Sequence, residues 1–211
     1  MRRKERGRYE RETVNAILDE ALICHVGFSV EGQPYVQPTI HARLGELLYL
    51  HGANTNRMLK SLAGGAAACV TATLLDGLVL ARSAFHHSMN YRSVMILGSA
   101  REVTDPAEKR RALEAVVEHV LRGRSAAVRA PDATELNATT VLALPITEAS
   151  AKIRTGPPLD DEADYALGCW AGVLPLRLGA LPPVPDPRLP AGIAAPQELA
   201  HWSRSGTPGQ G

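Results

Sequence analysis

The chain has 211 residues, of which 45% are hydrophobic and 21% are charged, so it can bury the core of a folded domain. Its formal net charge of +1 creates no field that favours nucleic acid or an anionic membrane. Its three cysteines lack CxxC spacing, which argues against a disulfide framework and a zinc ribbon. No apolar run reaches the roughly 18 residues of a membrane span, which argues against membrane insertion. We therefore expect a cytoplasmic protein without a secretion signal.

The first third of the chain predicts a helix followed by hairpin-connected strands. From Arg11, apolar positions recur at the three- and four-residue spacing of a helix that is buried on one face. Turn signals at 31–33 and 44–46 then separate three expected strands, which span residues 23–30, 34–43 and 47–51. Pro34 and Pro38 lack a backbone donor, which is tolerated only at an edge or an irregularity, so we expect the second strand to be bent or bulged.

Two further helices are predicted by their end signals. A short helix, NRMLKSL, follows the third strand, with Asn54 or Thr55 as its cap and Gly64-Gly65 as its stop. A longer helix begins at Asp105 with Pro106 in its first turn and ends before Gly123. The remaining expected strands span residues 67–75, 77–85, 92–103 and 139–146.

These elements predict a mostly β fold with α-helices, in which six or seven antiparallel strands curl into a split barrel with flanking helices. Neither GxGxxG nor GxxxxGK[ST] occurs, which excludes the two common Gly-rich phosphate cradles. After about residue 174 the sequence is too rich in proline for packed elements. We expect a barrel domain over residues 1–174 and a proline-rich tail over 175–211.

Two stretches concentrate groups that could bind a ligand. In HGANTNRMLKS, residues 51–61, a strand end meets a helix start, and Arg57 adds a charge that suits a phosphate. In FHHSMNYRSVMILG, residues 85–98, strand alternation puts Arg92 on the face opposite Ser93. The alternatives are a solvated arginine in the first stretch and an exposed polar hairpin loop in the second.

Three segments together resemble a known family. LLYLHGANTNRMLKSL, ARSAFHHSMNYRSVMILGSAREV and SAKIRTGPPLDDEADYALGCWAGVLPL are similar to the FMN-binding split β-barrel proteins related to pyridoxamine 5′-phosphate oxidase. The branch that contains the nitroimidazole-resistance proteins is the most similar, and the resemblance runs from about residue 10 to residue 177.

The resemblance implies a homodimer of split barrels that holds two FMN molecules at the subunit interface. One group of residues would lie along the flavin edge, another would meet its phosphate and ribityl chain, and a tryptophan would approach from the other subunit. The residues at the flavin edge would be Pro38, Thr39, Ile40 and His41. Those at the phosphate and ribityl chain would be His51, Gly52, Asn56, Arg57, Ser88, Tyr91, Arg92 and Ser93. The tryptophan would be Trp170. The family motif also puts Lys152 and Arg154 near the mouth of the site.

Two departures from the family pattern limit what it implies. Arg57 is followed by Met58 where relatives often carry a second basic residue, so phosphate affinity would rest on Arg57 and Arg92. The chain also lacks the C-terminal pattern by which true pyridoxamine phosphate oxidases hold their substrate, which argues against vitamin B6 oxidation.

We therefore expect an FMN-dependent oxidoreductase that acts on a small organic molecule, a nitro-group reductase being one version. A non-catalytic flavin or haem carrier and a deazaflavin-dependent reductase are the alternatives, because all three share the pocket and differ in the ligand. A bound flavin supplies the redox reactivity, so no catalytic side chain is assigned. His41, His86 and His87 either relay a proton or serve as hydrogen-bonded structural residues. No metal site is expected.

Overall fold

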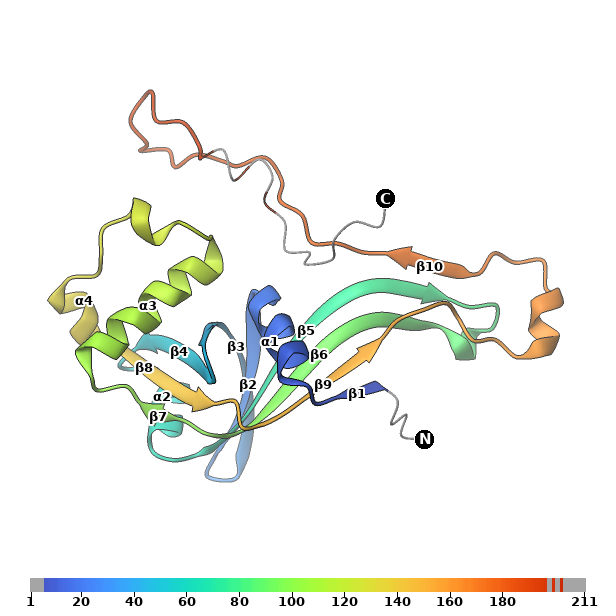
Figure 1. The fold of residues 1–211 in the computed structure, drawn as a ribbon, viewed down its shortest axis with the longest axis horizontal. Coiled ribbons are helices and arrows are strands. Elements are labelled where there is room, and N and C mark those ends of the chain that lie inside the picture. Colours follow the sequence, from blue (N-terminus) through green and yellow to red (C-terminus); the bar gives the residue numbers. More distant parts are fainter. Residues whose placement is uncertain (1–5, 197–198, 200–201, 203–211) are drawn as a thin grey trace. The chain divides into compact units, whose positions relative to one another are not determined.

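The computed structural model describes residues 6–196, 199 and 202. Its residues divide into two compact units, and the helices and strands of each can be found by their labels in Figure 1. Unit 1 comprises Met1–Leu74 and Tyr91–Thr155, and unit 2 comprises Leu75–Asn90 and Gly156–Gly211. This division groups part of the expected barrel domain with the proline-rich tail.

A mostly antiparallel sheet with a few helices confirms the expected fold class. The strands are β1 (Gly7–Arg8), β2 (Ile23–Val30), β3 (Gln33–Leu44), β4 (Leu47–Ala53), β5 (Ala67–Leu80), β6 (Ser88–Ser99), β7 (Arg101–Glu102), β8 (Thr139–Pro145), β9 (Glu148–Arg154) and β10 (Gly172–Pro175). The helices are α1 (Arg11–Glu20), α2 (Arg57–Ala63), α3 (Pro106–Val120) and α4 (Ala133–Ala138). The strand order is β1-β9-β6-β5-β2-β3-β4-β8-β7, an open path, with β10 paired to β5. Among the described residues the sheet thus has 10 strands, where the sequence predicted six or seven.

Strand β3 forms the corner between two parts of the sheet. Its residues 33–40 pair with β2 and its residues 41–44 pair with β4, so it changes partner within one strand. The β2–β3 register is regular over its whole length, and the expected bulge is therefore not formed. Pro34 and Pro38 lie in the part of β3 that pairs with β2, and among the described pairings this part has no second neighbour, where a missing donor is tolerated.

The core of unit 1 forms between one face of the sheet and the helices α1 and α2. Alternate residues of β2 face inward, and Cys24 and Val26 are fully buried. Helix α1 adds Val14, Ile17 and Leu18, as its apolar spacing predicted. Burial raises the pKa of the Cys24 thiol to about 12, so this cysteine is an inert core residue.

Two histidines, the buried His41 and the half-buried His119, hold the carbonyl groups at the end of α1. The Nε2–H of His41 on β3 donates to the carbonyl oxygen of Leu18 at 2.9 Å, and that of His119 on α3 donates to Ala21 at 2.8 Å. The two imidazole rings lie 4.8 Å apart, and His41 has no exposed surface. These bonds satisfy carbonyls that the helix itself leaves without a partner.

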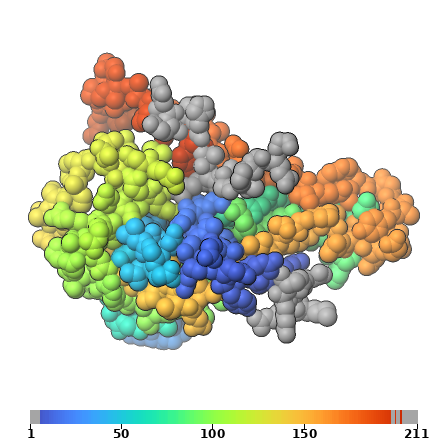
Figure 2. All heavy atoms as spheres, in the orientation of Figure 1, coloured from blue at the N-terminus to red at the C-terminus, as the bar shows by residue number. Residues whose placement is uncertain are grey.

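Two arginines hold the side chains of the same helical turn. Arg43 on β3 makes a bidentate pair with Asp19, with N–O distances of 2.8 and 2.5 Å. Arg92 on β6 pairs in the same way with Glu20, at 2.5 and 2.8 Å. Helix α1 is therefore fixed to β3, β6 and α3 by its last turn. Figure 2 shows the blue segment that contains α1 at the surface of unit 1.

The structure corrects the two strands predicted over residues 67–85. Residues 67–80 form one strand, β5, because Gly77 is not a turn residue. A Cβ atom on Gly77 would lie 3.0 Å from the carbonyl oxygen of Leu174, which belongs to the paired strand β10. This glycine allows close approach of a neighbouring backbone, and the sequence alone did not distinguish that role from a turn.

The helix ends follow the predicted signals with one correction. Asp105 caps α3 and accepts hydrogen bonds from two first-turn amides, as predicted. Helix α2 is capped by Asn56 rather than Asn54 or Thr55, since its side chain accepts from the Leu59 amide. The sequence missed α4, which begins with a capping box between Asp132 and Glu135. Among the described residues no helix is long and apolar enough to cross a membrane.

The histidine contacts predict a stability effect. Replacing His41 with alanine should lower the free energy of unfolding by about 1–3 kcal/mol, because the buried Leu18 carbonyl loses its donor. The matched control is His87→Ala, since His87 is exposed and bonds to the carbonyl of Ser83. Urea denaturation of both variants measures the difference, and equal stability would contradict a structural role for His41.

Candidate functional site

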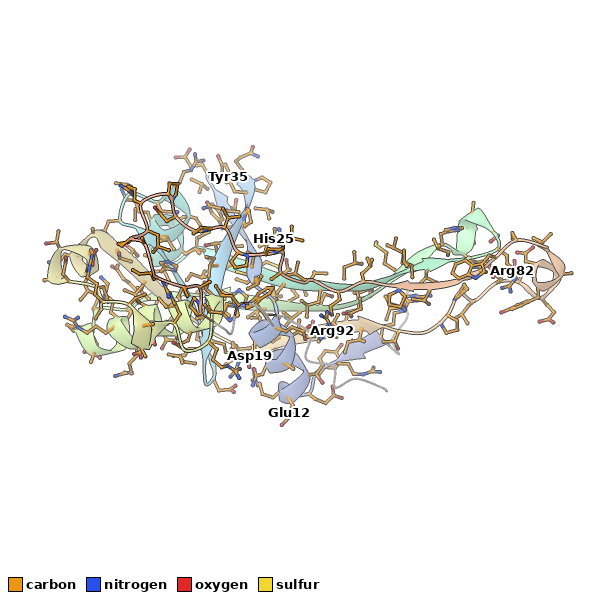
Figure 3. All side chains as sticks on the ribbon, turned by 90° about the horizontal axis from the view of Figure 1, so that it is seen from above. Glu12, Asp19, His25, Tyr35, Arg82 and Arg92 are labelled. Carbon is orange, nitrogen blue, oxygen red and sulfur yellow. The ribbon has the colours of Figure 1, made fainter. Side chains whose placement is uncertain are left out.

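The sheet face of unit 1 that points away from α1 carries the residues best placed to bind a ligand. We call this surface the outer face. Its side chains come alternately from five strands and comprise Ile23, His25, Gly27, Val36, Pro38, Ile40, Cys69, Thr71, Tyr91, Ser93, Met95 and Lys152. Figure 3 shows His25 on the side of the sheet opposite to Asp19 of α1.

One half of the outer face, on β6 and β9, is polar and cationic. Ser93 pairs directly with Lys152, and its hydroxyl donates to the Lys152 carbonyl at 3.4 Å. The ammonium nitrogen of Lys152 lies 5.9 Å from the centre of the Tyr91 ring. Two hydroxyl groups and one positive charge therefore share this half, a combination that suits an anionic group such as phosphate.

The other half, on β2 and β3, is apolar although it is exposed. Ile23 lies directly opposite Ile40, and they are 49% and 37% exposed. Val36 is 69% exposed and lies opposite Gly27. A Cβ atom on Gly27 would approach the Cys69 carbonyl oxygen to 3.3 Å, so the surface here stays low and flat. Grouped exposed apolar side chains on a sheet indicate a binding surface.

The predicted flavin-edge residues divide between three environments. Pro38 and Ile40 lie on the outer face, as a flavin edge requires. Thr39 alternates to the opposite face of β3. His41 is buried on the Leu18 carbonyl, so the structure gives it a structural contact in place of a position on this surface.

The predicted phosphate residue Arg57 lies against an aromatic ring. Its guanidinium carbon is 4.3 Å from the centre of the Tyr35 ring and it donates a hydrogen bond to the Tyr35 hydroxyl. Tyr35 in turn stacks on Phe28 at 5.4 Å between ring centres. Tyr35 and Phe28 alternate away from the outer face, so the chain does not bring Arg57 together with Ser93 or Lys152.

His51 and Gly52 occupy opposite faces of β4. Gly52 lies against α2, because a Cβ atom there would meet Leu59 at 3.1 Å and Asn56 at 3.6 Å. The Nδ1 atom of His51 is buried and makes no hydrogen bond with the described residues. Burial lowers the pKa of His51, so this imidazole is kept neutral. Gly52 thus serves helix packing, and so does Asn56, which caps α2.

Arg92 lies on the opposite face of β6 from its neighbours Tyr91 and Ser93. The expected alternation of β6 is confirmed, since Val94 and Ile96 are buried while Met95 is exposed. Tyr91 and Ser93 therefore belong to the outer face, and Arg92 reaches the carboxylate of Glu20. The sequence analysis grouped Tyr91, Arg92 and Ser93 at the phosphate, and the structure separates Arg92 from the other two.

Four further residues that the sequence analysis singled out belong to unit 2. Ser88 begins β6, and Trp170 is 69% exposed. His86 lies 3.6 Å from a carboxylate oxygen of Asp161, and His87 Nδ1 bonds to the Ser83 carbonyl at 2.9 Å. Both histidines therefore have local polar partners. No group of three or more potential metal ligands occurs among the described residues.

Comparison with known proteins identifies the family. The family profile described as pyridoxamine 5'-phosphate oxidase matches residues 10–153. The chain belongs to the pyridoxamine 5'-phosphate oxidase family. The resemblance noted in the sequence is thereby confirmed. Comparison with curated proteins found no match.

Two solved structures resemble nearly the whole chain. The flavocytochrome Anf3 from Azotobacter vinelandii is 44% identical, with a TM-score of 0.87 over 96% of this chain and 94% of that chain. The FAD and haem binding protein from Mycobacterium smegmatis is 36% identical, with a TM-score of 0.89 over 94% of this chain and 97% of that chain. A candidate 5-nitroimidazole antibiotic resistance protein from Bacteroides thetaiotaomicron is 24% identical over 70% of this chain and 86% of that chain, with a TM-score of 0.59, and shares the fold.

Local sequence patterns did not indicate a binding role for two outer-face residues, Lys152 and His25. Lys152 was placed near the site by the family resemblance alone, because the strand that carries it, β9, was not predicted as a whole. His25 was not singled out, although the alternation of β2 puts it on the face opposite the buried Cys24 and Val26. An exposed histidine between apolar neighbours was the available signal.

The Arg92–Glu20 pair predicts the behaviour of two variants. Arg92→Ala and Glu20→Gln should each lower the free energy of unfolding by about 1–3 kcal/mol, because each leaves a partly buried charge without its partner. In a double-mutant cycle the two effects should not add. Full additivity in thermal or urea unfolding would show that the pair does not hold α1.

Proposed function

We propose that the chain is a redox protein that binds a flavin and a haem and passes electrons between them. The observation that carries this proposal is the 44% identity with a flavocytochrome over 96% of the chain. A bound flavin and haem supply the electron-transfer chemistry, and the chain supplies binding, orientation and exclusion of water.

The outer face fits such cofactors on its own chemistry. Lys152 can place a positive charge beside a phosphate, and the hydroxyl group of Tyr91, next to Lys152, can donate a hydrogen bond to its oxygens. The flat apolar half, with Ile23 and Ile40 side by side, suits planar ring systems. Antiparallel sheets normally turn polar side chains to water on their open face, so an apolar half is explained by a ligand or partner.

The flavin we propose is FAD in place of the FMN expected from the sequence. Support comes from the protein of Mycobacterium smegmatis, which is described as binding FAD and haem and is 36% identical over 94% of this chain. Heat release of the bound flavin followed by chromatography against FAD and FMN standards decides between them.

We also propose that the functional form is a homodimer. Unit 2 exposes large apolar side chains, among them Phe85 at 90% and Trp170 at 69% exposure. A monomer gains nothing by leaving these groups in water, whereas a second copy of the chain could cover them. Light scattering of the cofactor-loaded protein should give twice the chain mass of 22.6 kDa, and a mass of 22.6 kDa would contradict the dimer.

A flavin-dependent oxidoreductase that acts on a small organic substrate, nitro compounds included, would use the same surface. A deazaflavin-dependent reductase would differ in the bound cofactor. Turnover measurements with the reduced protein separate these from electron transfer to haem, because a carrier reoxidises once whereas an enzyme consumes many equivalents of substrate.

The proposed role of Lys152 gives a direct test of the flavin site. Lys152→Ala should weaken flavin affinity by about 10- to 100-fold, since a charge-assisted hydrogen bond to phosphate is lost. Lys60→Ala is the control, because Lys60 is an exposed lysine in the last turn of α2. Titration of the apoprotein with FAD, followed by flavin fluorescence, measures both. Equal loss in the two variants, or loss in Lys60→Ala alone, would place the phosphate elsewhere.

A further inference from the structure

Most histidines of the described chain are engaged by neighbouring groups. His41 and His119 donate to the carbonyls at the end of α1. His87 bonds to the Ser83 carbonyl, and His86 faces Asp161. His51 is half-buried on β4 and faces away from α2. These contacts explain the histidines without a ligand, apart from the buried Nδ1 of His51.

His25 differs from the others in both position and environment. It is exposed in the middle of β2, on the outer face, between the buried Cys24 and Val26. Its ring makes no hydrogen bond or ion pair within the described part of the chain. A histidine that is held on a rigid strand and keeps its nitrogen atoms available can act as a metal ligand.

The residues around His25 on the outer face are mostly apolar. Pro38 lies directly opposite it on β3, and Thr71 lies opposite it on β5. Ile23, two residues earlier, faces the same way and is 49% exposed. Gly27, two residues later, has no side chain, and a Cβ atom there would be crowded by Cys69. The surface beside the imidazole is therefore open, low and apolar, as a large planar ring requires.

From this arrangement we infer that His25 is an axial ligand of the haem iron. One imidazole is sufficient to hold a haem on the protein, and the apolar surroundings limit access of water to the iron. This inference rests on the proposed function and assigns Pro38 to the haem surroundings in place of the flavin edge. The haem would lie on β2 and β3 and the flavin phosphate on β6 and β9, with β5 between them. Both redox groups would then occupy one face of one sheet.

The test is haem titration of the purified full chain and of two variants, followed by the Soret band and by electron paramagnetic resonance. His25→Ala should weaken haem affinity at least about tenfold, because even outer-shell changes cost about 10- to 100-fold at a metal site. Added imidazole should restore the spectrum of the wild-type protein, which a merely structural effect would not allow. His87→Ala is the control and should leave the spectrum unchanged, because His87 is exposed and bonds to the Ser83 carbonyl. Flavin affinity should be the same in all three proteins.

The outcomes separate this inference from the function on which it rests. If the wild-type protein takes up no haem, the proposed function fails and the ligand assignment fails with it. If the wild-type protein binds haem and His25→Ala keeps the same affinity and resonance signals, the assignment alone is overturned. Loss of the haem signals in His87→Ala with retention in His25→Ala would also overturn the assignment.

Discussion

The anchoring of the last turn of α1 is the constraint on which the arrangement of unit 1 depends. A helix of 10 residues is marginal by itself, so its position must come from tertiary contacts. Paired histidines bind the carbonyls of Leu18 and Ala21, and bidentate arginines bind the side chains of Asp19 and Glu20. The strands β3 and β6 and the helix α3 all contribute to this one turn, which fixes the helix on the inner face of the sheet and leaves the outer face open.

This arrangement explains why the sheet is apolar on both faces in its β2 and β3 region. The inner face buries Cys24 and Val26 in the core, whereas Ile23 and Ile40 remain exposed on the outer face. The anchored helix α1 lies on the inner side and leaves this outer surface uncovered, and we propose that a cofactor or a second subunit covers it. The polar half with Lys152 supplies the complementary charge. The sheet thus has an inner face that α1 covers and an outer face that is open to a cofactor.

The sequence predicted the fold class and family well because hydrophobic periodicity and turn residues are local signals. It did not predict which candidate site residues lie together, because the partner of a side chain can be far away in the sequence. Arg92 follows Tyr91 in sequence but faces Glu20 on α1, a partner 72 residues away that no local pattern indicates. His41 looked like a ligand residue and instead holds a helix carbonyl. His25 was overlooked because the exposed apolar surface around it forms only when β2 pairs with β3, which the alternation of β2 alone does not reveal.

Reductive titration of the purified full chain, followed by its visible spectrum, tests the central claim most directly. The account predicts that flavin bands and a Soret band are both present in the oxidised protein and that electrons added stepwise distribute between the two cofactors. Because both cofactors would occupy one sheet face, the haem should become reduced when only the flavin is supplied with electrons. A protein that binds neither cofactor, or a haem that stays oxidised beside a fully reduced flavin, would contradict the account.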